Sequence, residues 1–420
     1  MWSFKDFRFF VYSVTLLSQP VYWSLSSLMG QDVSIHDSAG RAFVAYNVFL
    51  FALTILFSFK DIKIRKISQG NRLLFGVILI YVVSFFVESL FSDATNTEWF
   101  GKSFLFFIMF GISGTLIGVV FWQKGTSQFY KHIDFLTFLI GIGYIRSIPM
   151  MIVAGDMLGG YQDIAYYSAL SFGFLFYGLI TNRSDRCFIF KYKLFRYLSA
   201  VIGVLLVICV LSSGGRGGLV LLVVEMFFCG YLLLKGKNLG SSIVVLSVLF
   251  VFILIVSNYI MNSSVNEIVN VGMERGLSYI DSGKIDITET SNRDLVYREH
   301  VNRIKDNPFL GEGIYTVLGK YEWPHNFFLE LLATGGIFLL LLWLCILVKC
   351  YKNYKRLVKV DRNNQYLVPL ILYVLIFLLF SSSYMETRVF WFTITVLLSV
   401  TYKYSHNNLN HWSADKINYV

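Results

Sequence analysis

The chain has few charged residues, and this shortage restricts the class of protein. Only 15% of its 420 residues are Asp, Glu, Lys or Arg, against roughly a quarter in ordinary soluble proteins, whereas 56% are hydrophobic. The apolar residues also come in long runs. This composition excludes a soluble protein and predicts an all-α, polytopic membrane protein.

Cysteines and metal-binding motifs are also scarce. The five cysteines lie in apolar runs or in loops predicted to face inward, and their spacing matches neither a disulfide framework nor a metal site. The motif HNFFLE at 325–330 lacks the second histidine and the adjacent glutamate of a zinc motif. No predicted strand precedes Gly311-Glu312-Gly313, so this motif is not a nucleotide-binding fingerprint.

Long apolar runs recur along the whole chain. Each of about twelve runs approaches the roughly 20 residues that a helix needs to cross the hydrocarbon layer. Basic residues precede the first run but no small-residue cleavage site follows it, so we expect the first helix to be retained. The predicted spans lie near residues 10–29, 42–59, 73–91, 103–122, 133–153, 163–181, 197–212, 218–234, 241–260, 326–348, 366–383 and 389–402.

Lysines and arginines are concentrated in alternate loops. Loops 60–72, 181–196 and 349–362 are strongly basic. The short loops on the other side of the membrane, around residues 32, 93, 156 and 385, hold at most one basic residue each. The positive-inside rule then places both termini in the cytoplasm and the long loop 261–324 outside. Since this topology accounts for the net charge of +10, we expect no nucleic-acid partner.

The predicted topology divides the chain into five segments. They are the N-terminal membrane helices (1–196), the helices flanking Arg216 (197–260), a long helical outer loop (261–325), the C-terminal membrane helices (326–405) and a cytoplasmic tail (406–420). Within the loop, Thr290 or Ser291 can cap a helix that Asn307-Pro308 stops after Asp306. Residues 266–283 are predicted to form a second, shorter helix.

The stretch 307–338 joins a polar half to an apolar half. Gly311 and Gly313 allow backbone conformations that other residues resist. Pro324 fits the start of a helix, so His325 and Asn326 are predicted to lie in its first turn, before an unbroken apolar helix. That turn is electropositive and favours anions.

His325 has three possible roles. It can act as a base, as a donor to an oxyanion or as a structural cap partner, since its ordinary pKa lies near neutrality. Its position at the membrane edge, beside Asn326 and one turn before Glu330, favours a functional role.

Two arginines are candidates for binding an anion. Arg216 lies in Ser212-Ser213-Gly214-Gly215-Arg216-Gly217-Gly218, where glycines allow a tight turn and a guanidinium can donate two parallel hydrogen bonds to a phosphate. The alternative is an arginine that snorkels from a helix end. Arg293 starts the outer-loop helix and is either a site residue or an ordinary solvated charge.

Three charged residues lie within or at the edge of predicted spans, where charges are costly. Arg146 and Glu225 form a buried pair, or Arg146, Glu225 and Arg388 line a path for phosphate groups. We expect Glu88, near an outer helix end, to contact water.

The order of these motifs resembles the O-antigen ligase and O-antigen polymerase superfamily. The resemblance is carried by the Arg216 break, the loop helix with Arg293, and NPxxGxG followed by HNxxLExxxxxG from Asn307 onward. One departure is Gly215, since the family often has serine immediately before the first arginine.

The resemblance implies a C-type glycosyltransferase-like fold with about twelve membrane helices, and neither a cofactor nor a metal. It implies that Arg216 and Arg293 hold the diphosphate of an undecaprenyl-diphosphate-linked oligosaccharide. His325 would orient or deprotonate the acceptor hydroxyl. The expected substrate-binding residues are Asn326, Glu330, Gly311, Gly313, Arg146 and Arg388.

We expect a polymerase that transfers a growing glycan to the non-reducing end of another lipid-linked repeat unit. The alternatives are a ligase that transfers the glycan to lipid A core, and a flippase or transporter of lipid-linked sugars. The expected location is the bacterial inner membrane, with the active site on the periplasmic side. The expected partners are the lipid-linked oligosaccharide, membrane lipid and a chain-length regulator protein.

Overall fold

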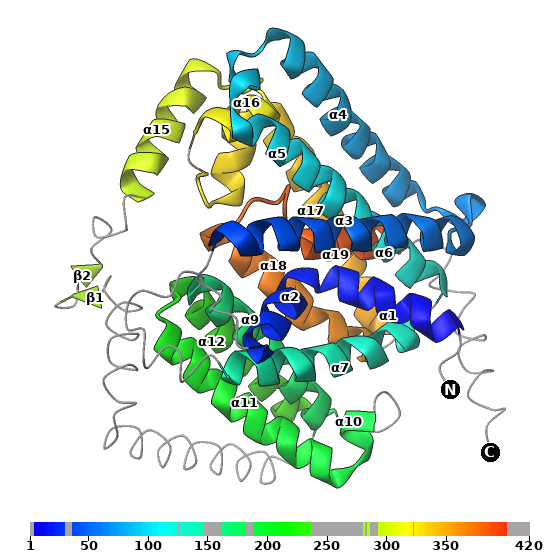
Figure 1. Cartoon of the computed structure of the whole chain (residues 1–420). Coiled ribbons are helices and arrows are strands. Elements are labelled where there is room, and N and C mark those ends of the chain that lie inside the picture. Colours follow the sequence, from blue (N-terminus) through cyan, green and yellow to red (C-terminus); the bar gives the residue numbers. More distant parts are fainter. Residues whose placement is uncertain are drawn as a thin grey trace. The chain divides into compact units, whose positions relative to one another are not determined.

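The computed structural model describes residues 4–29, 36–124, 126–146, 161–181, 188–236, 280–281, 284–285, 293–321, 323–360 and 362–400. The regular structure of these residues is helical, apart from the antiparallel pair β1 (Ile280–Asp281) and β2 (Lys284–Ile285) (Figure 1). The predicted all-α, polytopic membrane class is therefore confirmed. Ile280 and Asp281 correct the helix predicted at 266–283, whose other residues lie outside the described part.

Seven described helices are long and apolar enough to cross a membrane, and they coincide with seven of the predicted spans. Their bounds are Gly40–Asp61, Gln69–Phe91, Glu98–Lys124, Gln162–Ile180, Lys193–Ser213, Arg216–Leu233 and Phe327–Val358.

The other predicted spans are shorter than predicted, are divided into two helices, or lie at least partly outside the residues that the structure describes. The run 10–29 is divided at Leu17 into α1 (Phe4–Leu16) and α2 (Ser18–Leu28). The last two runs correspond to the shorter helices α18 (Val368–Phe380) and α19 (Arg388–Ser399). The predicted span 241–260, residues 147–153 of another span and the tail 406–420 lie outside the described residues.

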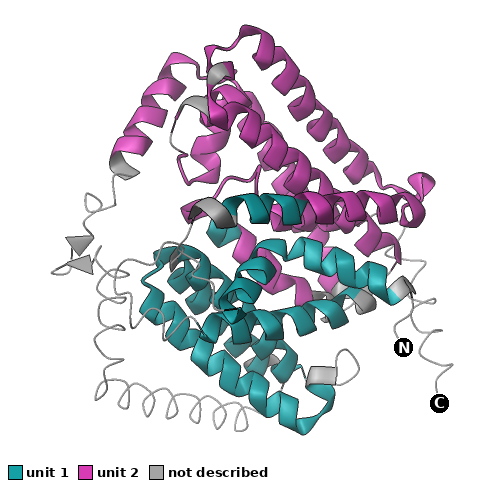
Figure 2. Ribbon diagram, in the orientation of Figure 1, with its two compact units in different colours: residues 1–47, 127–290, 375–377 teal, residues 48–126, 291–374, 378–420 magenta. Residues whose placement is uncertain are grey.

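The chain divides into two compact units (Figure 2). Unit 1 comprises residues 1–47, 127–290 and 375–377, and unit 2 comprises residues 48–126, 291–374 and 378–420. The longer helices of unit 1, besides α1 and α2, are α7 (Thr126–Ile145), α9 (Tyr161–Ile180), α11 (Lys193–Ser213) and α12 (Arg216–Gly236). Unit 2 contains α4 (Gln69–Phe91), α5 (Glu98–Phe106), α6 (Ser113–Lys124), α15 (Arg293–Asp306), α16 (Ile314–Lys320), α17 (Phe327–Val360) and α19.

Small residues allow close helix packing in unit 1, where α9 packs against α11 and α12. A Cβ added to Gly218 of α12 would lie 2.3 Å from the Cβ of Ala165 in α9. Small residues at helix contacts are typical of membrane proteins, because lipid provides no hydrophobic drive for association.

A buried hydrogen-bonded chain of aromatic residues ties the helices of unit 2 together. The indole N–H of Trp343 in α17 donates to the Tyr81 hydroxyl of α4 at 2.8 Å, and that hydroxyl lies 2.9 Å from the Tyr384 hydroxyl. Trp391 of α19 donates to the Tyr384 carbonyl at 2.9 Å. These contacts fix the segment between α18 and α19, which enters the candidate site described below.

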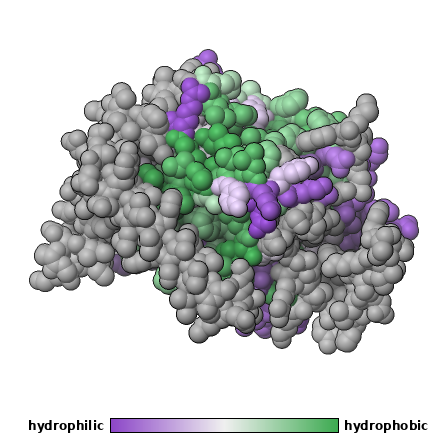
Figure 3. Space-filling view, turned by 90° about the horizontal axis from the view of Figure 1, so that it is seen from below, coloured by the Kyte–Doolittle hydropathy of each residue, from purple (hydrophilic) through white to green (hydrophobic). Residues whose placement is uncertain are grey.

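Large apolar side chains are also exposed on the outside of the helices. Phe59, Leu90, Phe91 and Phe227 are 76% to 84% exposed. Figure 3 shows a broad apolar area among the described residues of one face. Surfaces of this kind suit contact with lipid, as the span lengths also require.

Candidate functional site

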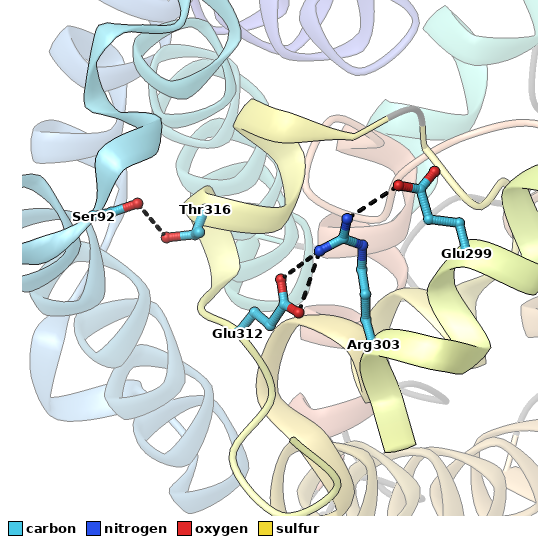
Figure 4. Close-up of polar contacts among 5 residues, drawn as sticks. All are labelled: Ser92, Glu299, Arg303, Glu312 and Thr316. Carbon is cyan, nitrogen blue, oxygen red and sulfur yellow. Dashed lines mark hydrogen bonds and ion pairs between the residues drawn. The ribbon is translucent and has the colours of Figure 1, made fainter. Parts of the chain in front are cut away.

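The predicted outer-loop helix is present as α15, and it begins at Arg293. Its last turn is attached to the Gly311-Glu312-Gly313 turn through one arginine (Figure 4). Arg303 Nη1 donates to both carboxylate oxygens of Glu312 at 3.1 and 3.3 Å, and Nη2 donates to Glu299 at 3.0 Å. The guanidinium carbon lies 3.1 Å from the centre of the Tyr321 ring.

Arg303 is therefore a fixed structural cation. Its side chain is 22% exposed. Burial lowers the pKa of Arg303, but the hydrogen bond with Glu299 and the charge of Glu312 outweigh this effect and raise the pKa above its ordinary value. The four side chains join α15, the glycine turn and the segment that leads to His325.

The glycine turn fits into a break in α17. At Gly336 the backbone leaves the helix, with φ 62° and ψ −161°. The N–H groups of 312–313 donate to the carbonyls of 333–334 at 3.0 and 3.1 Å, and the N–H of Ile337 donates to Pro308 at 2.9 Å. Backbone N–H and C=O groups that lose their helical hydrogen bonds inside a membrane need other partners of this kind. The predicted unbroken helix is therefore wrong at Gly336.

Gly311 and Gly313 have positive φ angles of 68° and 103°, as their predicted conformational freedom allows. A Cβ on Gly311 would lie 2.5 Å from backbone atoms of Thr334 and Gly335. In the structure, these glycines make backbone contact with α17. Their assignment as substrate-binding residues remains an expectation.

Glu88 of α4 caps the short helix that follows the glycine turn. Its carboxylate accepts hydrogen bonds from the N–H groups of Ile314, Tyr315 and Thr316 at 2.7 to 2.9 Å, and from the Thr316 hydroxyl at 2.9 Å. The Thr316 and Ser92 hydroxyl oxygens are 2.9 Å apart (Figure 4). Glu88 is thus half-buried and bound to α16, contacts that the expectation of contact with water did not include.

His325 precedes α17 and has an unusual backbone. Its φ of 46° is the one positive value among the described residues other than glycine. Such conformations cost free energy and are concentrated at functional sites. Asn326 caps α17, since its side-chain oxygen accepts from Phe328 and Leu329 N–H at 3.1 and 3.2 Å. The predicted placement of His325 and Asn326 inside the first turn is therefore wrong, because the Asn326 cap starts the helix at Phe327.

The imidazole of His325 is oriented by a backbone carbonyl. Nδ1 lies 3.0 Å from the carbonyl oxygen of Ser381. A carbonyl can only accept a hydrogen bond, so this contact assigns the hydrogen to Nδ1. In the neutral ring, Nε2 then carries the lone pair, as a base requires.

Glu330 lies one turn into α17 and is only 2% exposed. Its carboxylate accepts a hydrogen bond from the Ser383 hydroxyl, and that hydroxyl accepts from the Met385 N–H at 3.1 Å. Glu330 therefore anchors the segment 381–387, which also holds the carbonyl that orients His325. Its contact is with protein, and direct binding of substrate by Glu330 stays an expectation.

The same segment contains Glu386, which the sequence analysis did not single out. Burial and the nearby charge of Glu330 raise the pKa of Glu386 to about 8. Its Oε1 atom is fully covered and has no hydrogen-bond partner. The only sequence signal was a polar run, SSSYMETR, between two apolar runs.

Arg388 begins α19 and is 4% exposed. Its Nε donates to the Ser113 hydroxyl at 2.8 Å, and Nη2 donates to the Met109 carbonyl at 3.4 Å. Its guanidinium lies 4.7 Å from the Phe110 ring centre. These contacts join α19 to the π-helical turn Phe107–Ile112 between α5 and α6.

Arg216 belongs to unit 1, where the predicted glycine break is present. Gly214 ends α11 in the left-handed conformation, with φ 67°, and Arg216 is the first residue of α12. Arg216 is half-buried. The electropositive end of α12 and the guanidinium together make this break suitable for an anion.

Of the two alternatives for Arg146 and Glu225, the buried pair is not formed. Arg146 is exposed at the end of α7 and donates to the Leu28 carbonyl at the end of α2. Glu225 is fully buried against Gly173, and neither carboxylate oxygen has a hydrogen-bond partner. The arginine instead interacts with a helix C-terminus, where a cation is favourable.

The structure thus brings together, within unit 2, the helix of Arg293, the glycine turn and His325. Sequence reasoning missed Arg303, Ser383 and Glu386 in this arrangement, and it named Glu88 without its role as a helix cap. Among the described residues, no group of three His, Cys, Asp or Glu side chains could hold a metal ion.

Residues 200–344 match a family model described as O-antigen ligase. The match contains α12 with Arg216, α15, the glycine turn, His325 and the first half of α17. It supports the O-antigen polymerase and ligase group in general, whose members are membrane glycosyltransferase-like enzymes. A comparison with curated proteins finds no match.

Proposed function

We propose, from the match of residues 200–344 to the O-antigen ligase family, that the chain is a glycan polymerase of the bacterial inner membrane. It transfers a growing glycan from undecaprenyl diphosphate to the non-reducing end of another lipid-linked repeat unit. The site faces the periplasm and both termini face the cytoplasm.

The observation that carries this proposal is the geometry of His325. A strained backbone and a carbonyl on Nδ1 fix a histidine whose Nε2 can accept a proton, within the matched family region. The acceptor hydroxyl oxygen bonds to the anomeric carbon, and the bond from that carbon to the diphosphate oxygen breaks. The hydroxyl proton passes to Nε2, and undecaprenyl diphosphate leaves with the electron pair.

The two candidate arginines serve the leaving group. Negative charge grows on the diphosphate as its bond to the sugar breaks, and Arg216 and Arg293 neutralise that charge. Loss of one preorganised contact of this kind costs roughly a hundredfold to a thousandfold in rate. Lysine at either position should restore only part of the rate, because it lacks the paired donors of arginine.

The second candidate function is that of a ligase, which the description of the matched family favours. The donor chemistry is the same, and lipid A core replaces the repeat unit as acceptor. The chemistry at His325 and the arginines does not distinguish the two acceptors.

The test is to incubate the purified chain in lipid with undecaprenyl-diphosphate-linked repeat units and to separate the products by size. A ladder of multiples that disappears in His325→Ala and Arg293→Ala supports a polymerase. A product formed only after addition of lipid A core supports a ligase.

The matched control for the arginine is Arg298→Ala, which removes an exposed arginine from the same helix and should leave the ladder unchanged. Full activity in both Arg216→Ala and Arg293→Ala would refute the diphosphate assignment. Absence of any product with confirmed substrate would favour a flippase or transporter.

A further inference from the structure

Two tryptophans from distant parts of the sequence contact each other, and one of them is close to His325 in the chain. Trp99 lies in the first turn of α5, and Trp323 lies two residues before His325. Their ring centres are 6.0 Å apart, and the rings meet edge to face at 72°. Trp99 is 48% exposed and Trp323 is half-buried. The pair is therefore a partly exposed aromatic surface, and one of its residues is two positions before the candidate catalytic residue.

A buried aromatic cluster holds this surface in place. Phe100 and Phe104 of α5 both contact Tyr315 of α16 edge to face, at 6.2 and 5.7 Å between ring centres. Tyr315 is fully buried, and the Glu88 cap fixes the start of its helix. Since α16 leads into the segment with Trp323, both tryptophans are attached to packed elements, as a preorganised binding surface requires.

Polar groups border the aromatic surface. Lys102, one turn after Trp99, has its Nζ 5.0 Å from the Trp99 ring centre. It also forms an ion pair with Glu98. An aromatic surface with a few polar groups beside it is the usual composition of a small-ligand site.

We propose that Trp99 and Trp323 bind a sugar ring of the acceptor glycan. The negative face of an indole attracts the weakly positive C–H groups on one side of a pyranose ring. Lys102 and Glu98 are a donor and an acceptor for the sugar hydroxyls. Bound there, the acceptor has a hydroxyl presented to His325. This assignment rests on the proposed function, and it adds the subsite that receives the acceptor.

The alternative role of such residues is the aromatic belt of membrane proteins, in which tryptophan sits at the interface without binding sugar. Phe91 provides a matched control, because it is 84% exposed at the end of α4, which is predicted to reach the same side. Phe91→Leu removes an exposed aromatic ring and leaves the tryptophan pair intact.

The first measurement is binding without any lipid donor. The full chain in lipid is titrated with the repeat-unit oligosaccharide, released by mild acid from the lipid-linked intermediates of the host cells, while indole fluorescence is followed. Trp323→Leu and Trp99→Leu should each raise the dissociation constant by about tenfold. Trp323→Phe should retain most of the affinity, because it keeps a ring, and Phe91→Leu should bind as the wild type does.

The second measurement separates the subsite from the chemistry. Trp323→Leu should raise the KM for the acceptor by about tenfold and leave kcat and the KM for the donor nearly unchanged. Unchanged binding and KM in both tryptophan variants, or equal losses in Phe91→Leu, would overturn the subsite. Tryptophan-dependent binding without any transfer would support the subsite and refute the proposed function. Transfer without tryptophan dependence would refute the subsite alone.

Discussion

The carboxylate of Glu88 accepts hydrogen bonds from the backbone N–H and the hydroxyl of Thr316, at 2.7 and 2.9 Å, although 228 residues separate them in sequence. Glu88 also accepts from Ile314 and Tyr315 N–H. A negative side chain at the first turn of a helix satisfies N–H groups that have no partner within the helix. The end of α4 is thereby attached to the element that leads towards His325.

Replacing Glu88 by alanine should destabilise unit 2 and lower transfer activity. Loss of a cap costs about 1 kcal/mol, and each buried N–H left without a partner adds roughly 1–3 kcal/mol. Thermal unfolding in detergent and the product ladder measure the two effects. Ser89→Ala changes the exposed neighbour on the same helix and should lower neither the stability nor the transfer activity. Wild-type stability in Glu88→Ala would show that the cap is dispensable.

The Arg303–Glu312 pair should be needed for activity through position rather than through contact with substrate. Arg303→Ala leaves Glu312 half-buried without its cation, which should cost about 1.5–3 kcal/mol of stability and lower the rate. The double exchange Arg303→Glu and Glu312→Arg should recover part of the stability and part of the rate, because the ion pair is restored with its polarity reversed. It is made together with Glu299→Gln, so that no second carboxylate faces position 303. A purely substrate-binding arginine would not be rescued in this way.

The fit between the glycine turn and α17 gives a third stability prediction. Gly311→Ala and Gly336→Ala each place a side chain at positive φ, and the new Cβ would meet backbone atoms within 2.5 Å and 2.2 Å. Such strain costs of order 1–3 kcal/mol. Gly76→Ala in α4 is the matched control, since nothing lies within 4 Å of its Cβ position. Thermal unfolding should therefore separate the first two variants from the third.

Local signals in the sequence were sufficient to predict some features of the fold and of the candidate site. Asn307-Pro308 correctly predicted the end of α15, because proline disfavours helix at the preceding residue. Glycines correctly predicted the break before Arg216, where Gly214 has φ 67°. Signals of this kind act within a few residues, so they can be recognised in the sequence without knowledge of contacts between distant segments.

Other features depend on contacts between distant segments. The partner of Glu88 could not be read from a sequence in which Thr316 lies 228 residues away. The break at Gly336 was missed because a broken and a straight helix have the same apolar pattern, and only the partners at 308–313 distinguish them. A buried Arg146–Glu225 pair was one of two alternatives, since both are charges in apolar runs, but Arg146 donates to the carbonyl of Leu28.

Stability should fall with rising pH because of Glu386. The folded pKa of about 8 exceeds the ordinary value of 4.5, since burial and the charge of Glu330 disfavour the ionised form. Between these two values the folded chain binds more protons than the unfolded chain, so the free energy of unfolding decreases as pH rises. Melting temperatures from pH 5 to about pH 9 should decline in the wild type.

Glu386→Gln should make this decline less steep, because glutamine stays neutral. Glu299→Gln, at an exposed carboxylate on α15, should leave the decline as it is in the wild type. An equally steep decline in Glu386→Gln would assign the pH dependence to another group.

The predicted topology can be tested with two exposed positions that are predicted to lie on opposite sides of the membrane. Asn302 lies on α15, which is predicted to be outside, and Lys355 lies near the end of α17, in a loop predicted to be inside. In a variant without the five native cysteines, Asn302→Cys should react with an impermeant thiol reagent in intact spheroplasts. Lys355→Cys should react only after the membrane is opened, because the hydrocarbon layer excludes a charged reagent. The reverse labelling pattern would place α15 and His325 in the cytoplasm, where a glycan carried on the outer face of the membrane could not reach them.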